Sequence, residues 1–144
     1  MTEVAFHFNT PDKVGYACRL LRKAVGSGAV VVVTGDPALL DELDGALWTF
    51  SALDFVPHCR DTAAPAPVVA LSPVVLTGSP RAAPHHQVLV NLGDAVPEGF
   101  ETFERLIEVV TADEADRQSA RLRWKHYSAR GYDIRRHDRA QEPQ

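Results

Sequence analysis

The sequence lacks the features that mark a secreted, membrane-spanning or zinc-binding protein. Its two cysteines, Cys18 and Cys59, lie 41 positions apart, and neither they nor the pair His85 and His86 have further ligands at zinc spacing. The longest apolar run, residues 29–33, is far too short to cross a bilayer, and the first residues hold no basic segment followed by an apolar one. We therefore expect a cytoplasmic protein with reduced thiols, no metal site and no membrane contact.

Motifs for catalysis and for phosphate binding are also absent. No G-x-G-x-x-G, G-x-x-x-x-G-K-[ST] or G-x-S-x-G pattern occurs. Residues 34–37 could form a nucleotide-binding turn, but they hold one glycine, and Pro37 removes an amide donor that such a turn would use. We therefore expect no catalytic residue, no cofactor and no enzyme.

Charge is unevenly distributed along an otherwise ordinary composition. The chain has 144 residues, 45% hydrophobic and 24% charged, which suits one globular domain with a single core. Its net charge is −4, but eight basic residues lie between Arg117 and Arg139 against Asp133 and Asp138 alone. The carboxyl-terminal end is therefore a positive patch on an acidic body, a pattern suited to an anionic partner.

The first half of the chain alternates strands with helices. Apolar residues at every second position predict a strand over residues 4–8, and a continuous apolar run predicts a buried strand over 29–34. Helical spacing predicts one helix over residues 12–25 and another after Asp36, a good N-cap, with Pro37 in its first turn. This order indicates an α/β fold, a single-domain layered structure with a mostly parallel (mixed) central sheet flanked by helices.

The middle of the chain is less regular. Residues 61–84 are rich in alanine, proline and serine, and we expect 68–71 and 74–76 to form short strands or edge segments, because proline at this density excludes central strands. Residues 87–92 predict a clearer strand. Residues 103–110 fit either a helix or a strand.

A long carboxyl-terminal helix follows. It is expected to begin near Asp113, in a turn rich in acidic residues, and to end at Gly131, a plausible left-handed cap. We assign residues 1–137 to the single domain and expect residues 138–144 to be a frayed tail.

One stripe of this helix combines cations with an aromatic ring. Its members, at helical spacing, are Arg117, Arg121, Trp124 and Ser128. Guanidinium groups beside an indole can hold a carboxylate by forked hydrogen bonds and receive an apolar side chain next to it. From spacing alone, a solvated basic face with Trp124 and Tyr127 packed inward is an equally good interpretation.

A second aromatic group follows the second predicted helix. It consists of Trp48 and Phe55, which Phe50 and Val56 could extend. Burial in the core is the better explanation on sequence alone, but exposed aromatics in a small apolar patch are also what an interface anchor requires.

The order and spacing of four segments carry a resemblance to a known family. The segments are 43–48 (LDGALW), 55–58 (FVPH), 88–93 (VLVNLG) and 121–132 (RLRWKHYSARGY). Together they resemble the chi subunit of bacterial DNA polymerase III holoenzyme, a family of small, non-catalytic proteins associated with the clamp loader. The resemblance spans nearly the whole chain and favours a strand for residues 103–110.

The resemblance implies two binding sites. Chi subunits bind the acidic, phenylalanine-ending tail of single-stranded DNA-binding protein through the terminal helix, here Arg117, Arg121 and Trp124, with Val110 as apolar floor and Ser128 on the same stripe. The family more often has tyrosine at the Trp124 position, so the ring is preserved.

The other implied site binds the psi subunit. By resemblance it falls on Trp48 and Phe55, with Phe50 and Val56 beside them, and a helicase can compete for it. DNA would then be contacted only indirectly. Two alternatives stay open: a small nucleotide-binding α/β enzyme with its site near Gly35, and a direct nucleic-acid-binding module, against which the acidic body speaks.

Overall fold

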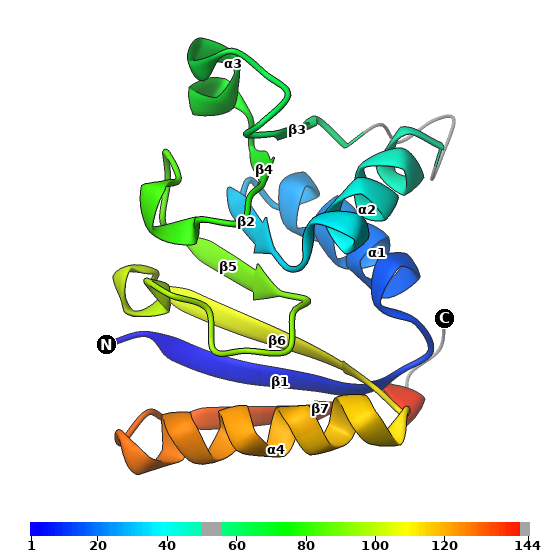
Figure 1. Ribbon diagram of the computed structural model, residues 1–144, viewed down its shortest axis with the longest axis vertical. Coiled ribbons are helices and arrows are strands. Elements are labelled where there is room, and N and C mark those ends of the chain that lie inside the picture. Colours follow the sequence, from blue (N-terminus) through cyan, green and yellow to red (C-terminus); the bar gives the residue numbers. More distant parts are fainter. Residues whose placement is uncertain (50–55, 142–144) are drawn as a thin grey trace.

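The computed structural model, which describes residues 1–49 and 56–141, is built on one parallel sheet (Figure 1). Its seven strands follow the order β3-β4-β2-β5-β6-β1-β7, and every neighbouring pair is parallel. The strands are β1 (Glu3–Thr10), β2 (Val31–Thr34), β3 (His58–Arg60), β4 (Val74–Leu76), β5 (Val88–Asn91), β6 (Arg105–Thr111) and β7 (Ile134–Asp138). The predicted α/β class is confirmed, and over the described residues the sheet is wholly parallel rather than mixed.

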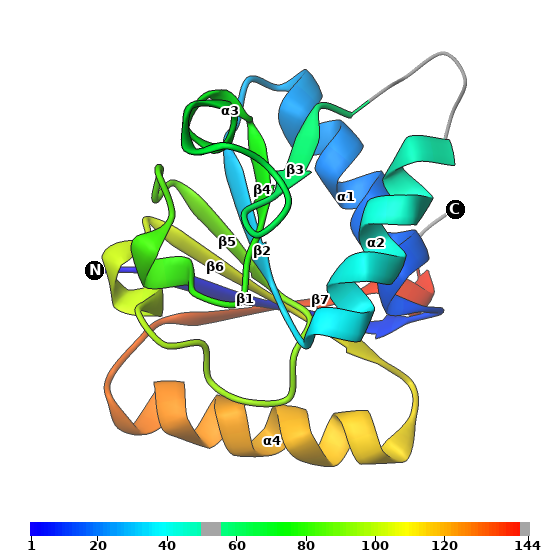
Figure 2. The same ribbon diagram turned by 45° about the horizontal axis from the view of Figure 1, so that its top comes forward.

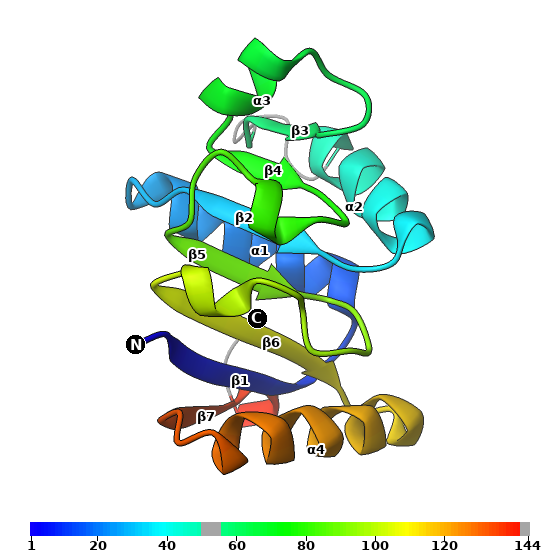
Figure 3. The same cartoon turned by 60° about the vertical axis from the view of Figure 1, so that its left-hand side comes forward.

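Helices lie on both faces of this sheet (Figures 2 and 3). The α-helices are α1 (Lys13–Gly26), α2 (Pro37–Thr49), α3 (Ala66–Leu71) and α4 (Glu114–Ala129), and short 3-10 turns form η1 (Pro80–Ala82), η2 (Phe100–Thr102) and η3 (Arg139–Gln141). Alternation along β6 shows the two layers: Ile107 and Val109 join the core under α1 and α2, whereas Leu106 and Val110 join the core under α4. In the described part of the chain, no helix is long and apolar enough to span a membrane.

Several predicted elements are confirmed together with their caps. Asp12 caps α1 by accepting a hydrogen bond from the amide of Gly15, and the Asp36 carboxylate accepts one from Ala38 at the start of α2. Past the end of α4, Gly131 has a φ of 80°, the left-handed conformation expected of a helix cap. The predicted strands around β1, β2, β5 and β6 are also present, and both cysteines are buried free thiols.

The prediction for residues 61–84 is partly wrong. Residues 68–71 lie in α3, where Pro67 falls in the first helical turn, a position that needs no amide donor. Residues 74–76 do form a strand, β4, but it is fully buried between β3 and β2 rather than at an edge. Proline does not prevent this, because Pro73 precedes the strand and its carbonyl accepts a hydrogen bond from Val31.

The two edge strands, β3 and β7, were not predicted. Both are short and polar, so they lack the apolar alternation that marks a half-buried strand. The sequence suggests a frayed tail from residue 138 onward, but Asp138 belongs to β7 and η3 follows it. There the Asp138 carboxylate accepts a hydrogen bond from the side chain of Asn9 on β1.

A buried polar network joins α4 to the sheet. Glu108 of β6 is fully buried, and its carboxylate accepts hydrogen bonds from Arg123 (3.0 Å), from the Tyr127 hydroxyl and from the Asn91 amide (3.0 and 3.1 Å). Arg123 also donates to the carbonyl of Asp94 at 3.0 Å. Burial raises the pKa of Glu108, and Arg123, Tyr127 and Asn91 oppose that shift by stabilising the carboxylate.

We predict that Arg123→Ala destabilises the protein strongly. Removing one partner of a buried ion pair typically costs about 3 to 5 kcal/mol, because the other charge is left unpaired. Urea unfolding should show this loss, whereas Arg130→Ala on the exposed end of the same helix should change the free energy of unfolding by less than about 0.5 kcal/mol. Equal stabilities of the two variants would contradict the role given to the network.

His7 lies on the face of β1 that points away from α4, among other basic groups. Its Nδ1 is 2.5 Å from the Tyr16 hydroxyl, and the His137 ring is 4.9 Å away. Burial, and then the charges of Arg139, His137 and Arg105, lower the pKa of His7 from 6.5 to about 3. The imidazole is therefore neutral in the folded protein at pH 7.

This depressed pKa makes stability depend on pH. Between about pH 6.5 and about pH 3 the unfolded chain binds a proton at His7 that the folded protein does not, so stability falls as the pH falls through that window. The free energy of unfolding should drop by about 2 kcal/mol more between pH 7 and pH 5 in the wild type than in His7→Gln. Parallel urea titrations at both pH values measure it, and an identical drop in the two proteins would exclude His7 as the cause.

Candidate functional site

A small pocket lies between α4 and the carboxyl-terminal halves of β1, β6 and β7. Its volume is about 210 Å³, and its walls are formed by Phe6, Phe8, Val110, Arg117, Ala120, Arg121, Trp124 and Arg136. We call it the α4 pocket. It contains four of the five residues proposed for tail binding: Val110, Arg117, Arg121 and Trp124.

The first turn of α4 is firmly held next to this pocket. The Asp113 side chain caps the helix, and the Asp116 carboxylate accepts hydrogen bonds from the backbone amide (2.7 Å) and hydroxyl (3.0 Å) of Thr111. Lys13 of α1 pairs with Asp116 at 2.9 Å. Burial alone would raise the pKa of Asp116, but these partners outweigh it and hold that pKa below its usual value.

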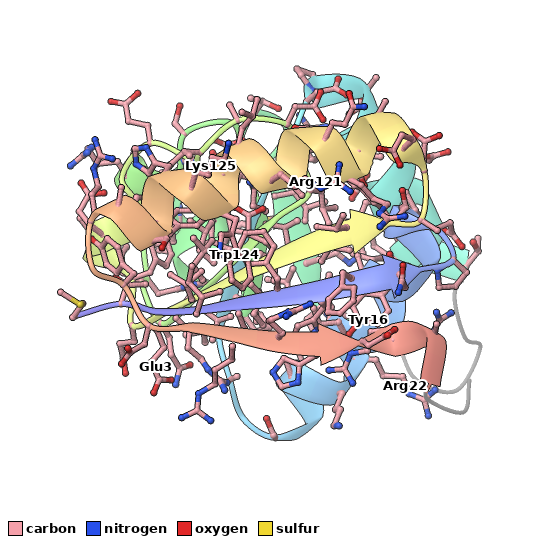
Figure 4. All side chains as sticks on the ribbon, turned by 90° about the horizontal axis from the view of Figure 1, so that it is seen from below. Glu3, Tyr16, Arg22, Arg121, Trp124 and Lys125 are labelled. Carbon is pink, nitrogen blue, oxygen red and sulfur yellow. The ribbon has the colours of Figure 1, made fainter. Side chains whose placement is uncertain are left out.

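Aromatic rings form the floor of the pocket. Trp124 is partly buried, and its ring packs 5.1 Å from that of Phe6. Figure 4 shows Trp124 between α4 and the strands. The guanidinium of Arg136, on β7, lies 5.8 Å from the Trp124 ring and 5.5 Å from the Phe8 ring. These are cation–π distances, so Arg136 is held over the apolar floor.

Two further arginines border the pocket from α4. Arg117 and Arg121 approach the carboxylate of Glu114 at 4.0 and 3.4 Å, and their side chains are 48% and 57% exposed. Ion pairs this exposed contribute little stability, so a competing carboxylate can replace Glu114 at small cost. The pocket can thus bind a carboxylate at its cationic rim and an apolar side chain on its floor.

Other sequence-predicted positions fall outside the pocket. Ser128 is exposed one turn beyond Trp124 and does not line it. Tyr127 points into the core, where its hydroxyl donates a hydrogen bond to Glu108. This ring therefore packs inward, which is one of the two interpretations that the helical spacing allows. Trp124 combines both interpretations, because it packs on Phe6 and still lines the pocket.

Sequence reasoning missed four pocket residues: Phe6, Phe8, Ala120 and Arg136. The two phenylalanines belong to the predicted first strand, but nothing in the chain tells that this strand lies under α4. Arg136 comes from β7, which was not predicted. No local signal marks this strand, because Ile134 is its one apolar residue and Arg136 and Asp138 on the same face are charged.

The second proposed site is only partly described. Trp48, at the end of α2, is 61% exposed, and its ring lies 5.1 Å from that of His58 on β3. Val56 is buried in the core under α1 and α2, so it does not contribute exposed surface. Phe50 and Phe55 lie outside the described residues. The structure thus favours the exposed interpretation for Trp48 and burial for Val56.

The turn considered for nucleotide binding has the wrong charge. A cavity of about 360 Å³ at the carboxyl ends of β2 and β5 includes Gly35. The Asp36 carboxylate occupies the amide of Ala38 in the first turn of α2. Lys13, the one cation among the described lining residues, already bonds to the Leu92 carbonyl and Asp116, each at 2.9 Å. Among the described lining residues, therefore, no cation without a partner remains to bind phosphates.

Within residues 1–49 and 56–141, no three histidine, cysteine, aspartate or glutamate side chains lie close enough to hold a metal ion.

Comparison with known proteins gives a consistent family. The profile of the family described as "DNA polymerase III chi subunit, HolC" matches residues 1–135. DNA polymerase III subunit chi of Pseudomonas aeruginosa is 33% identical over 142 residues, which cover 95% of this chain and 96% of the relative. The subunit of the same name from Haemophilus influenzae is 28% identical over 122 residues, covering 82% and 81% of the two chains.

Proposed function

The chain belongs to the DNA polymerase III chi subunit family, and we propose that it acts in the polymerase as a non-catalytic adaptor. One site would bind the psi subunit, and the other the carboxyl-terminal tail of single-stranded DNA-binding protein. The observation that carries the proposal is the α4 pocket, in which three arginines surround an aromatic floor. Catalysis has no support from the described residues, where the candidate nucleotide turn carries acidic groups.

The α4 pocket suits the end of an acidic peptide. A terminal carboxylate and neighbouring acidic side chains would pair with Arg117, Arg121 and Arg136, and a phenylalanine ring would lie against Phe8 and Trp124. A hollow of about 210 Å³ is smaller than most drug-sized ligand sites but sufficient for one side chain. The pocket therefore fits a peptide anchor better than a cofactor.

Trp48 supports the psi site. A large ring that is 61% exposed at a helix end is the kind of anchor that interface hot spots use. In Figure 1, α2 lies in the upper right part of the molecule, whereas α4 runs along the bottom, beyond the strands β6, β1 and β7. Both partners could then bind at once, and two linked contacts strengthen each other through effective concentration.

We predict that Arg121→Ala weakens binding of an acidic, phenylalanine-terminated peptide by about thirtyfold or more. Truncating one member of a charged hydrogen-bonded pair costs about 2 kcal/mol or more at a desolvated contact. Glu114→Gln should have the opposite effect and tighten binding, because it removes the carboxylate that competes for Arg117 and Arg121. Calorimetric titration compares the three proteins.

Two controls test whether the loss of peptide affinity in Arg121→Ala comes from the α4 pocket. Arg139→Ala should leave peptide affinity unchanged, since Arg139 does not line the α4 pocket. Wild-type affinity should fall as ionic strength rises, because salt screens exposed charges. Equal affinities of wild type and Arg121→Ala would remove α4 from the binding site even though the family assignment would stand.

We predict that Trp48→Ala abolishes most psi binding without unfolding the protein. Loss of an interface anchor costs about 2 kcal/mol or more of binding energy, whereas a side chain that is 61% exposed contributes little to folding. Val56→Ala is the matched contrast, with a loss of about 2 kcal/mol in unfolding free energy, because Val56 is buried. Co-purification with psi and thermal unfolding test both variants, and full psi binding by Trp48→Ala would refute the assignment.

A further inference from the structure

A groove lies on the face of the sheet opposite α4 and is not used by the proposed function. Its volume is about 570 Å³, and it runs between α1 and the strands β1, β6 and β7. Apolar side chains form its inner surface, including Ala5 and Ile107 from the strands and Leu20 and Ala24 from α1. We call it the sheet groove.

Strand alternation brings basic side chains to this groove. Arg136 of β7 reaches the α4 pocket, so its neighbours Arg135 and His137 project to the other face, where both line the groove. On β6, Arg105 lies on the same face, two residues before Ile107. The strands therefore contribute cations around the apolar surface.

The rim of the groove is strongly positive for an acidic protein. Its cations are Lys23, Arg105, Arg135 and Arg139, and Glu3 is the one carboxylate among the described lining residues. The local net charge is therefore +3, although the whole chain carries −4. Glu3 lies 3.7 Å from Arg105, and this exposed pair neutralises little of the field.

The titration of His7 is consistent with a positive potential in the groove. His7 lines it, and after burial the charges of Arg139, His137 and Arg105 are what lower the pKa of this imidazole to about 3. Burial, the larger cause, disfavours a charge of either sign, but the part of the shift that comes from Arg139, His137 and Arg105 reflects a positive potential, and such a potential attracts an anion at the exposed rim.

We propose that the sheet groove binds a short segment of single-stranded DNA. Phosphates would lie at the rim among Lys23, Arg105, Arg135 and Arg139, a positively charged track of the kind that single-strand sites use, and a base would lie against the inner surface, which here is aliphatic rather than aromatic. An acidic peptide fits less well, because its backbone amides would face Ala5, Ile107 and Leu20 without hydrogen-bond partners.

This inference goes beyond the proposed function and does not depend on it. From the sequence we expect DNA to be contacted only indirectly. Here the protein itself would make a weak, local contact with DNA on an otherwise acidic surface. Figure 4 shows α4 with Arg121 and Trp124 on one side of β7, and Glu3 and Arg22 on the other. A DNA segment in the groove and a peptide in the α4 pocket could therefore be bound together.

The test is fluorescence anisotropy with a labelled oligothymidylate of about twelve nucleotides. For four phosphate contacts, the logarithm of the binding constant should fall with the logarithm of salt concentration with a slope of about −3. Lys23→Glu with Arg135→Glu should weaken binding about tenfold or more at low salt and reduce that slope by about half. Both side chains are exposed, and thermal unfolding checks that the double variant is folded.

The matched control is Lys125→Glu with Arg130→Glu, which makes the same change in net charge at two exposed residues, one on α4 and one at its C-cap, outside both sites. It should retain most of the oligonucleotide affinity. An equal loss in both double variants would overturn the proposal, as would no binding by the wild type at about 50 mM salt.

Competition identifies the occupant and the site. A saturating concentration of acidic tail peptide should leave oligonucleotide binding unchanged. If the peptide displaces the oligonucleotide, the DNA binds in the α4 pocket instead. If polyglutamate binds as tightly as the oligonucleotide, and if Lys23→Glu with Arg135→Glu weakens its binding equally, the groove is a peptide site. Thymidine monophosphate that competes with equal affinity would make it a pocket for free nucleotides. Each of these three results would overturn the proposal.

Discussion

The ion pair between Glu108 and Arg123 is the interaction on which the arrangement of α4 depends. Both side chains are almost completely buried, and each charge taken out of water costs several kcal/mol unless it is fully paired. Tyr127 and Asn91 supply the additional donors that the carboxylate needs. These hydrogen bonds can all form in one orientation of α4 about its axis. The polar network inside the core therefore selects one placement of α4.

That rotation determines what the helix presents on its other sides. Trp124 follows Arg123 directly, about 100° around the helix, which takes it from the buried side to the edge that overlies Phe6. Arg121 and Arg117 continue this edge toward solvent. A helix rotated by one residue would break the Glu108 pair and also disperse the pocket. The pocket is therefore preorganised by contacts that never touch its ligand, which reduces the ordering cost of binding.

The sequence reveals what depends on local pattern and misses what depends on long-range contacts. Caps and helical spacing predicted α1, α2 and α4 because those signals act within a few residues, and they placed Arg117, Arg121 and Trp124 on one stripe. The helix over residues 66–71 is not apparent from the sequence, because proline at this density predicts strand edges and turns. Arg136 and the Glu108 network could not be predicted, since both require knowing which strand lies under α4. Arg123 and Tyr127, one turn apart and facing a lone carboxylate in an apolar strand, were the available hint.

The edge strand β7 also changes how the positive carboxyl-terminal segment is understood. From the sequence it is one basic patch, but the two-residue period of a strand sends Arg136 to the α4 face and Arg135 and His137 to the α1 face. Arginine at successive positions therefore contributes to two separated surfaces with different apolar floors, one aromatic and one aliphatic. A shift of β7 by one residue against β1 would exchange these side chains and also turn the half-buried Ile134 away from the core that it packs against. The packing of Ile134 thus keeps the two positive surfaces distinct.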